Sequence, residues 1–174
     1  RLATRALEHP VLDEHVAAVC TLAACEWTAG EFVAAEQRLR ALLPEVRGQG
    51  DLSELDTYYA LACLYAWQRR ELEALVMARR SLAVAEVRTD LHPVHVAHAL
   101  SALADAYRSL EDDVGLTTAA QRMLAVSTRL AEPDAGRLRR QAYVNAHEAA
   151  LLRDEVAAAR EQLTVVARLK TLEI

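Results

Sequence analysis

The sequence has little glycine, little proline and few aromatic residues. Five glycines and four prolines in 174 residues leave few helix breakers, which favours long helices joined by short turns. Aromatic residues make up only 5% of the chain although 53% of it is hydrophobic, and the remainder of that apolar content is mostly Ala, Leu and Val. Ala and Leu are strong helix formers, and no segment shows the alternating pattern of a strand. These features predict an all-α protein.

Further absences exclude several classes of function. Lys and Arg number 20 against 25 Asp and Glu, a net charge of −5, whereas binding to a phosphate backbone needs a basic surface. We therefore expect no direct contact with nucleic acid. No signal peptide is evident and no apolar run is long enough to cross a membrane, so a cytoplasmic protein without membrane contact is expected. The sequence also lacks a glycine-rich phosphate loop and has no serine in the context of a nucleophile. We therefore expect that the protein is not an enzyme and binds no cofactor.

Cysteine and histidine offer no metal site at familiar spacing. The three cysteines lie within helical patterns and form no CxxC motif, which favours buried free thiols: Cys20, Cys25 and Cys63. His92, His95 and His98 recur every three residues, so two of them can share a helical face. No carboxylate or cysteine completes that group at the spacing of a metal site, and no metal is expected.

Helix-start and helix-stop residues divide the chain into eight predicted helices. They cover residues 10–28, 31–47, about 53–68, 71–87, 93–109, 118–130, a segment ending near 153, and 155–169. Pro10 and Pro93 suit first helical positions because proline lacks the N–H that would be unsatisfied there. Ser53 with Asp56 resembles the N-terminal cap of the third helix.

The predicted helices form pairs that repeat along the chain. A Leu-Ala dipeptide near the end of each first helix recurs at nearly constant intervals: Leu22-Ala23, Leu61-Ala62 and Leu103-Ala104. A weaker fourth copy, Ala146-His147, follows after a similar interval and has a large residue where a small one is expected. Repeats of roughly 40 residues are typical of a stacked solenoid.

A second register of small residues lies in the second helices. The same fixed spacing separates Ala23 from Ala35, Ala62 from Ala74, and His147 from Ala159. In the third repeat Leu116 occupies the equivalent position, and a small residue comes four positions later at Ala120. This offset predicts a longer internal turn, with non-helical backbone somewhere between Leu110 and Thr117 and a capping box formed by Thr118 and Gln121.

Two stretches resemble a known repeat family. "LAACEWTAGEFVAAEQRLRALLP" (residues 22–44) resembles the core of a tetratricopeptide repeat, with Leu, Ala, Gly, an aromatic residue, Ala, Leu and Pro in order. "LHPVHVAHALSALADAY" (residues 91–107) is similar to the longer variant of about 42 residues found in kinesin light chains. The resemblance implies one right-handed α–α superhelix over residues 1–174, with about four helix pairs near residues 10–48, 51–88, 93–131 and 133–172.

The first residues extend the pattern toward the N-terminus. "RLATRALEHP" (residues 1–10) resembles "EQRLRALLP" (residues 36–44), the end of a second helix, so residues 1–9 are interpreted as the tail of a preceding repeat in a longer chain. A solenoid end exposes an apolar face. We therefore expect the helix over residues 10–28 to be partly uncovered, or covered by a second copy of the chain.

The resemblance also implies where a partner binds. First helices of such repeats line a concave groove, and aromatic and arginine side chains are the usual energetic anchors of an interface. Tyr65 and Tyr107 lie where the repeat packs its own core. The face of the first helices that lines the groove also includes Val144 and Leu151 in repeat four. The candidate binding residues on this face are Trp27, Tyr59, Trp67, His98, Ser101, Asp105, Arg108 and Glu148.

Three functions agree with these observations. The first is a protein–protein interaction module that recognises a peptide or protein segment in its groove. The second is the sensory or oligomerising region of a larger bacterial transcriptional regulator, an analogy at the level of the family. The third is a receptor domain for a peptide or small ligand. A DNA-binding motif elsewhere in the protein favours the second, and an enclosed pocket favours the third.

Overall fold

The computed structural model of the chain describes residues 10–88, 90–153, 161 and 163–168. This part of the chain is helical and contains no strand, which confirms the all-α prediction. The helices are α2 (Pro10–Thr28), α3 (Phe32–Val46), α4 (Leu52–Trp67), α5 (Glu71–Val87), α6 (Pro93–Ser109), α7 (Asp113–Ser127) and α8 (Asp134–Leu152). Of the predicted last helix, residues 161 and 163–168 are helical and the others lie outside the described residues, as do residues 1–9. None of the described helices is both long and apolar enough to cross a membrane.

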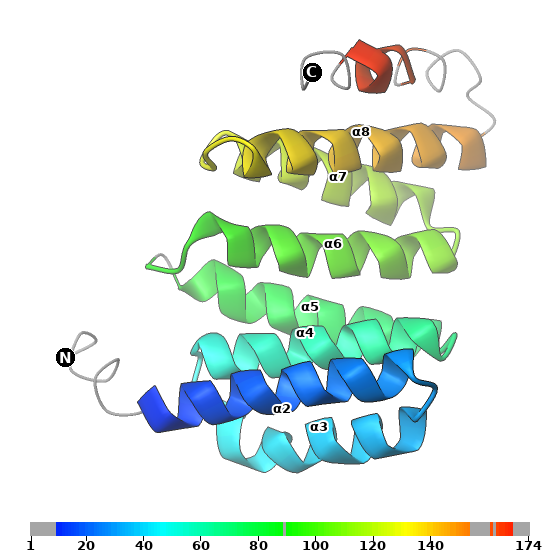
Figure 1. Cartoon of the computed structure of the whole chain (residues 1–174). Coiled ribbons are helices and arrows are strands. Elements are labelled where there is room, and N and C mark those ends of the chain that lie inside the picture. The colour runs from blue at the N-terminus through cyan, green and yellow to red at the C-terminus, as the bar shows by residue number, and fades with distance from the viewer. Residues whose placement is uncertain (1–9, 89, 154–160, 162, 169–174) are drawn as a thin grey trace. The chain divides into compact units, whose positions relative to one another are not determined.

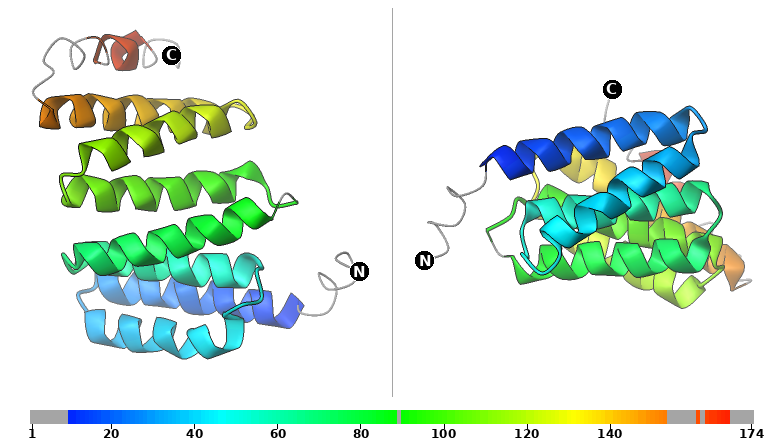
Figure 2. Two further views of the ribbon diagram at one scale, coloured as in Figure 1. Left: turned by 180° about the vertical axis from the view of Figure 1, so that it is seen from behind. Right: turned by 90° about the horizontal axis from the view of Figure 1, so that it is seen from below.

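The chain divides into two compact units, unit 1 (Arg1–Leu91) and unit 2 (His92–Ile174). In unit 1, α2 packs against α3 and α4, and α4 packs against α3 and α5. The α2–α3 and α4–α5 turns lie at one end of this unit, and the α3–α4 connection lies at the opposite end (Figures 1 and 2). In unit 2, α7 packs against both α6 and α8, and α6 also contacts α8. Within each unit, consecutive helices therefore run antiparallel (Figure 1).

The three turns within helix pairs share one backbone geometry. Each has three residues, and the middle residue is left-handed: Gly30 (φ 89°), Arg69 (φ 59°) and Glu111 (φ 55°). In each turn, the last residue donates its backbone N–H to the carbonyl of the residue five positions earlier, at a distance of 2.9 Å: Glu31 to Glu26, Arg70 to Tyr65, and Asp112 to Tyr107. This bond closes the helix C-terminus and reverses the chain. These turns recur at the same intervals along the chain as the Leu-Ala dipeptides.

The predicted longer turn in the third repeat is wrong. Helix α7 begins at Asp113 and continues through Gly115, because the Asp112 side chain accepts a hydrogen bond from the Gly115 backbone N–H at 2.8 Å. Thr118 forms no capping box with Gln121, since it lies within α7 and its hydroxyl donates to the Val114 carbonyl one turn earlier.

The third pair therefore keeps the register of the other two. Leu116 is the fourth residue of α7, as Ala35 is of α3 and Ala74 is of α5. All three are buried. The backbone N–H of each donates to the carbonyl of the last turn residue, which again makes the three positions equivalent. The third pair thus has a leucine where the first two pairs have an alanine, and its turn contains no inserted residue.

The cap of α4 also differs from the prediction. Asp51, not Ser53, is the N-cap, and its side chain accepts from the Glu54 backbone N–H at 2.9 Å. Ser53 lies inside the helix and is buried. The Glu54 carboxylate reaches back and accepts from the backbone N–H groups of Gly48 (2.9 Å) and Gly50 (2.7 Å). This explains how a buried carboxylate is tolerated in the connection between α3 and α4.

Small residues occupy the tightly packed positions that the repeat pattern predicts. Ala23, Ala62 and Ala104 are all buried, whereas His147 is only partly buried in the atypical fourth copy. Tyr65 is buried as predicted. Tyr107 is partly exposed, and its ring lies over Gly115, where an added Cβ would be 2.4 Å from the Tyr107 Cδ1 atom.

The three cysteines form no disulfide, but they are not all buried. Cys20 and Cys63 are partly buried and Cys25 is exposed, so the predicted burial of Cys25 is wrong. Burial, followed by the nearby Asp56 carboxylate of α4, raises the pKa of the Cys20 thiol to about 12. Cys25 lies with Leu22 (46% exposed) on a face of α2 that the described residues leave open. The described residues thus leave part of α2 uncovered.

The cap of α7 provides a test of these assignments. Replacing Asp112 with Ala removes the acceptor for the Gly115 N–H, and we expect the free energy of unfolding to fall by about 1 kcal/mol. The equivalent N-cap residue of α3, Glu31, makes no side-chain capping bond, so Glu31→Ala should change the stability by less than about 0.5 kcal/mol. Urea unfolding followed by circular dichroism measures both changes. Equal losses for the two variants would contradict the capping role of Asp112.

Candidate functional site

We call the surface between α6 and α8 of unit 2 the α6–α8 groove; it runs from the pocket-lining residue Val94 to the Arg108–Glu148 ion pair. At one end it forms a pocket of about 310 Å³. The walls combine apolar, polar and charged side chains from α6, from the α7–α8 connection and from α8: Val94, Ala97, His98, Ser101, Leu130, Asp134, Arg137, Leu138 and Gln141. The pocket is a concave site of a size that suits one or a few side chains of a partner or a small ligand.

The α6 wall of the groove contains residues that the sequence predicts as binding residues. His98, Ser101, Asp105 and Arg108 are spaced by three, four and three positions, so they follow one face of α6. His98 and Ser101 line the pocket, and the Ser101 hydroxyl donates to the Ala97 carbonyl at 3.0 Å. On the α8 wall, only Glu148 was among the binding residues predicted from the sequence. The other residues of this wall become adjacent to α6 only after folding.

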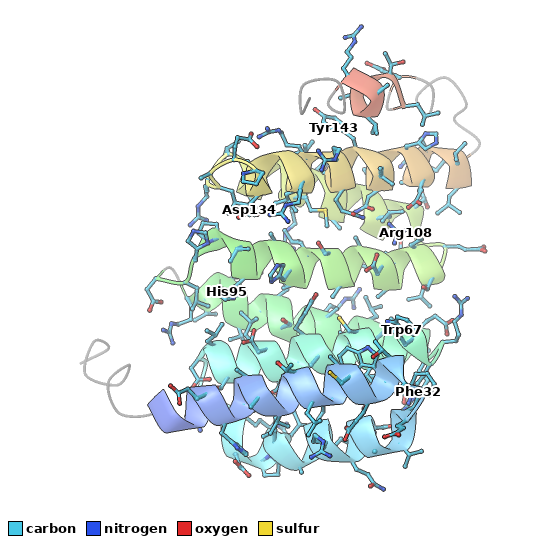
Figure 3. All side chains as sticks on the ribbon, viewed as in Figure 1. Phe32, Trp67, His95, Arg108, Asp134 and Tyr143 are labelled. Atoms are coloured by element: carbon cyan, nitrogen blue, oxygen red, sulfur yellow. The ribbon has the colours of Figure 1, made fainter. Side chains whose placement is uncertain are left out.

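Arg108 lies at the other end of the groove and joins the two helices. Its guanidinium donates to Glu148 Oε2 at 2.5 Å, to Asn145 Oδ1 at 2.7 Å, and to Asp105 Oδ1. Figure 3 shows Arg108 in unit 2 away from Asp134, which lies at the start of α8. Burial opposes the positive charge, but the hydrogen bonds to Glu148 and Asp105 overcome it and raise the pKa of Arg108. The predicted pairing of Asp105 with Arg108 is confirmed, and Glu148 joins them.

Asn145 supports this cluster from the α8 side. It is fully buried, and its side-chain oxygen accepts from Arg108 and, at 3.1 Å, from Gln141 Nε2. Its amide nitrogen contacts the Met123 sulfur of α7 at 3.4 Å. Gln141 also lines the pocket, so the buried amide connects the pocket to the charged end of the groove.

Removing that amide should destabilise unit 2. Asn145→Leu leaves Arg108 and Gln141 without a buried acceptor, and we expect the free energy of unfolding to fall by about 1–3 kcal/mol. Gln141 is partly exposed, so Gln141→Leu should cost less than about 1 kcal/mol. Urea unfolding measures both variants. A cost for Gln141→Leu as large as that for Asn145→Leu would contradict the central role of the buried amide.

The remaining predicted residues of repeat four lie nearby on α8. Val144 lines a second hollow of about 370 Å³ with Arg137, Arg140, Gln141 and Val166. Leu151 is 51% exposed near the end of the helix. The two hollows share Arg137 and Gln141, so α8 presents a continuous stretch of polar and aliphatic side chains.

The predicted aromatic residues all belong to unit 1. Trp27 and Tyr59 are partly buried, and Trp67, the last residue of α4, is 60% exposed. Figure 3 shows Trp67 and Phe32 at the end of unit 1 that carries the turns within helix pairs. That these aromatic residues share one concave surface with the charged residues of unit 2 stays a prediction.

The three histidines have different surroundings. The His92 ring caps α6, with Nδ1 accepting from the Val94 backbone N–H at 3.3 Å, whereas His98 is exposed. Burial, followed by the nearby His98 and His92, lowers the pKa of His95. Within the described part of the chain, no group of three or more His, Cys, Asp or Glu side chains could hold a metal ion.

Comparison with known proteins adds no relative. No protein-family model, no curated protein and no solved structure matches this chain.

Proposed function

We propose that this chain is a protein-interaction module built from tetratricopeptide-like repeats, and that it binds a peptide or protein segment in the α6–α8 groove. Two sets of observations support the proposal. One concerns the repeats and the other concerns the groove.

The repeat proposal rests on geometry that recurs along the chain. Three turns have the same length, the same left-handed middle residue and the same closing hydrogen bond, at nearly constant intervals. A fourth helix end follows this pattern, since the Arg153 backbone N–H donates to the Ala149 and Leu151 carbonyls as that of Leu110 does to Ala106 and Arg108. Four helix pairs of this kind would stack as a right-handed superhelix, with first helices as the inner layer.

The groove itself carries the binding proposal. A partly apolar pocket of about 310 Å³ and a cluster of partly exposed charged groups lie along the same two helices. Apolar anchoring beside polar contacts that set the register is the usual design of a peptide-binding surface. The net charge of −5 and the two carboxylates in the groove argue against a nucleic-acid partner.

A peptide selection with matched tryptophan variants tests this proposal. Peptides selected from a library of short random sequences would be synthesised with a fluorescent label, and their affinity measured by fluorescence polarisation. His98→Trp places a large side chain at the pocket wall and should weaken binding at least about tenfold. His15, on α2 in unit 1, is also exposed, so His15→Trp is the matched control and should change the affinity less than about twofold.

The same measurements can reject the site. Selected peptides that bind His98→Trp as tightly as the unaltered chain would show that the groove is not where they bind. A selection that enriches no peptide would count against the whole proposal. Thermal unfolding of both variants verifies that any loss of affinity is not a loss of structure.

A small-molecule receptor is the second candidate, favoured by the composition of the pocket. His98, Ser101 and Gln141 supply polar groups beside the apolar Leu130 and Leu138, and the volume lies at the lower end of the range for ligand pockets, about 300–1,000 Å³. A metabolite library screened by thermal shift tests this alternative. A stabilising compound whose effect disappears in His98→Trp but persists in His15→Trp would support it.

A further inference from the structure

The two ends of the α6–α8 groove differ in charge, and this difference restricts the chemistry of a partner. The pocket end carries the ion pair of Arg137 with Asp134, which is neutral as a unit. At the other end, one guanidinium faces two carboxylates, since Arg108 pairs with both Asp105 and Glu148. The charged cluster therefore keeps a net charge of −1 when all three groups are ionised.

The two carboxylates of this cluster also retain hydrogen-bonding capacity. Arg108 uses Oδ1 of Asp105 and Oε2 of Glu148, and each ionised carboxylate has a second oxygen that can accept further bonds. The Asp105 side chain is 53% exposed and that of Glu148 is 35% exposed, so both are accessible to a ligand in the groove. A cation of the partner beside either carboxylate would find an acceptor oxygen that Arg108 does not use.

We infer that the partner is a segment with an aliphatic side chain for the pocket and a lysine or arginine for the Asp105–Glu148 carboxylates. This inference rests on the proposed function and names the class of partner for the same site. The aliphatic side chain would contact the apolar walls formed by Val94, Ala97, Leu130 and Leu138. The cation would make charge-assisted hydrogen bonds at the other end.

Helix geometry gives the spacing between the two anchors. His98 at the pocket and Asp105 at the charged end are seven residues apart on α6, which corresponds to about 10 Å at 1.5 Å per residue. An extended segment advances about 3.3 Å per residue, and a polyproline segment about 3.1 Å. In an extended or polyproline partner, the aliphatic and basic residues are therefore about three positions apart.

An acidic partner fits this groove poorly. A carboxylate or phosphate of the partner that approached Arg108 would also approach the negative charges of both Glu148 and Asp105. Like charges brought together in an interface are strongly unfavourable. The net charge of −5 on the whole chain also favours the approach of a cationic segment.

The peptide selection tests this inference through a different readout, the sequence of the enriched peptides. We expect an aliphatic residue and a Lys or Arg about three positions apart in most of them. A labelled consensus peptide should bind the double variant Asp105→Asn, Glu148→Gln about tenfold more weakly, because both carboxylate charges are lost. Replacing its basic residue with norleucine should weaken binding to the unaltered chain by a similar factor and have little effect on binding to the double variant.

A control variant separates the groove from the overall charge. Glu31 and Glu45 are exposed in unit 1, and Glu31→Gln, Glu45→Gln changes the net charge by the same amount outside the groove. This control should alter the affinity less than about twofold. A loss as large as that of the groove variant would overturn the inference, because long-range charge alone would then explain the preference.

The outcomes distinguish this inference from the proposed function. Enriched peptides without basic residues that still lose affinity in His98→Trp would overturn the cationic partner and leave the groove as the binding site. Peptides that bind His98→Trp normally would overturn both. Basic peptides that lose affinity in both His98→Trp and the double carboxylate variant would support both.

Discussion

Leu61→Ala is expected to lower the free energy of unfolding of this protein by about 2–5 kcal/mol. Leu61 is fully buried in α4, the helix that packs against both α3 and α5 in unit 1. Truncation to alanine removes apolar contacts and leaves a cavity that the surrounding helices can fill only in part. Urea unfolding followed by circular dichroism measures the loss.

Leu72→Ala is the matched control for this change. Leu72 belongs to the same unit, on α5, but its side chain is 70% exposed. The same truncation there removes little packing, and we expect a change within about 0.5 kcal/mol. Similar losses for both leucines would mean that the buried and exposed faces of the helix pair are wrongly assigned.

Ala104→Leu is expected to destabilise unit 2 by about 1–3 kcal/mol. Ala104 is fully buried on α6, which packs against α7 and α8, and three extra carbon atoms cannot fit there without displacing a helix or distorting side chains. The same substitution at Ala125, which is exposed on α7, removes no packing and slightly raises the local apolar surface. Thermal and urea unfolding should show little change for Ala125→Leu.

The outcome for Ala104 tests the repeat register directly. If Ala104→Leu is as stable as the unaltered chain, Ala104 does not lie at the close helix contact. The register assigned from the Leu-Ala dipeptides would then be wrong. Because α6 also forms one wall of the groove, a displaced helix should in addition weaken the binding of the selected peptide. A variant that is destabilised yet binds the peptide normally would separate the packing contact from the groove.

The groove shows why a candidate binding site is harder to predict than the helices that form it. His98, Ser101, Asp105 and Arg108 could be placed on one face of α6 because their spacing follows a helical turn. Which residues face them depends on how α8 packs. The α8 wall lies far along the chain from α6, and nothing in its local pattern separates it from a solvated helix face: Asp134, Arg137, Leu138 and Gln141.

The third repeat illustrates the same limit for secondary structure. Asp112 and Thr118 are both suitable N-cap residues by type, and the small Ala120 favoured the later start. The helix starts early because the three-residue turn closes on Tyr107, the Asp112 side chain caps Gly115, and Leu116 is buried. Glycine at position 115 leaves room for the Tyr107 ring, a contact between two helices that no local propensity encodes.

The amino-acid sequence by itself determined the helical class, most helix ends and the interval between the Leu-Ala dipeptides, because these depend on local effects. Proline at the first position of α6, glycine in the α2–α3 turn and the spacing of alanines act within a few residues of themselves. Tertiary structure alone decided the register of the third pair, the exposure of Cys25 and the α8 wall of the groove. These features depend on side chains from separate helices competing for the same space and the same hydrogen bonds, as Asn145, Glu148 and Asp105 do around Arg108.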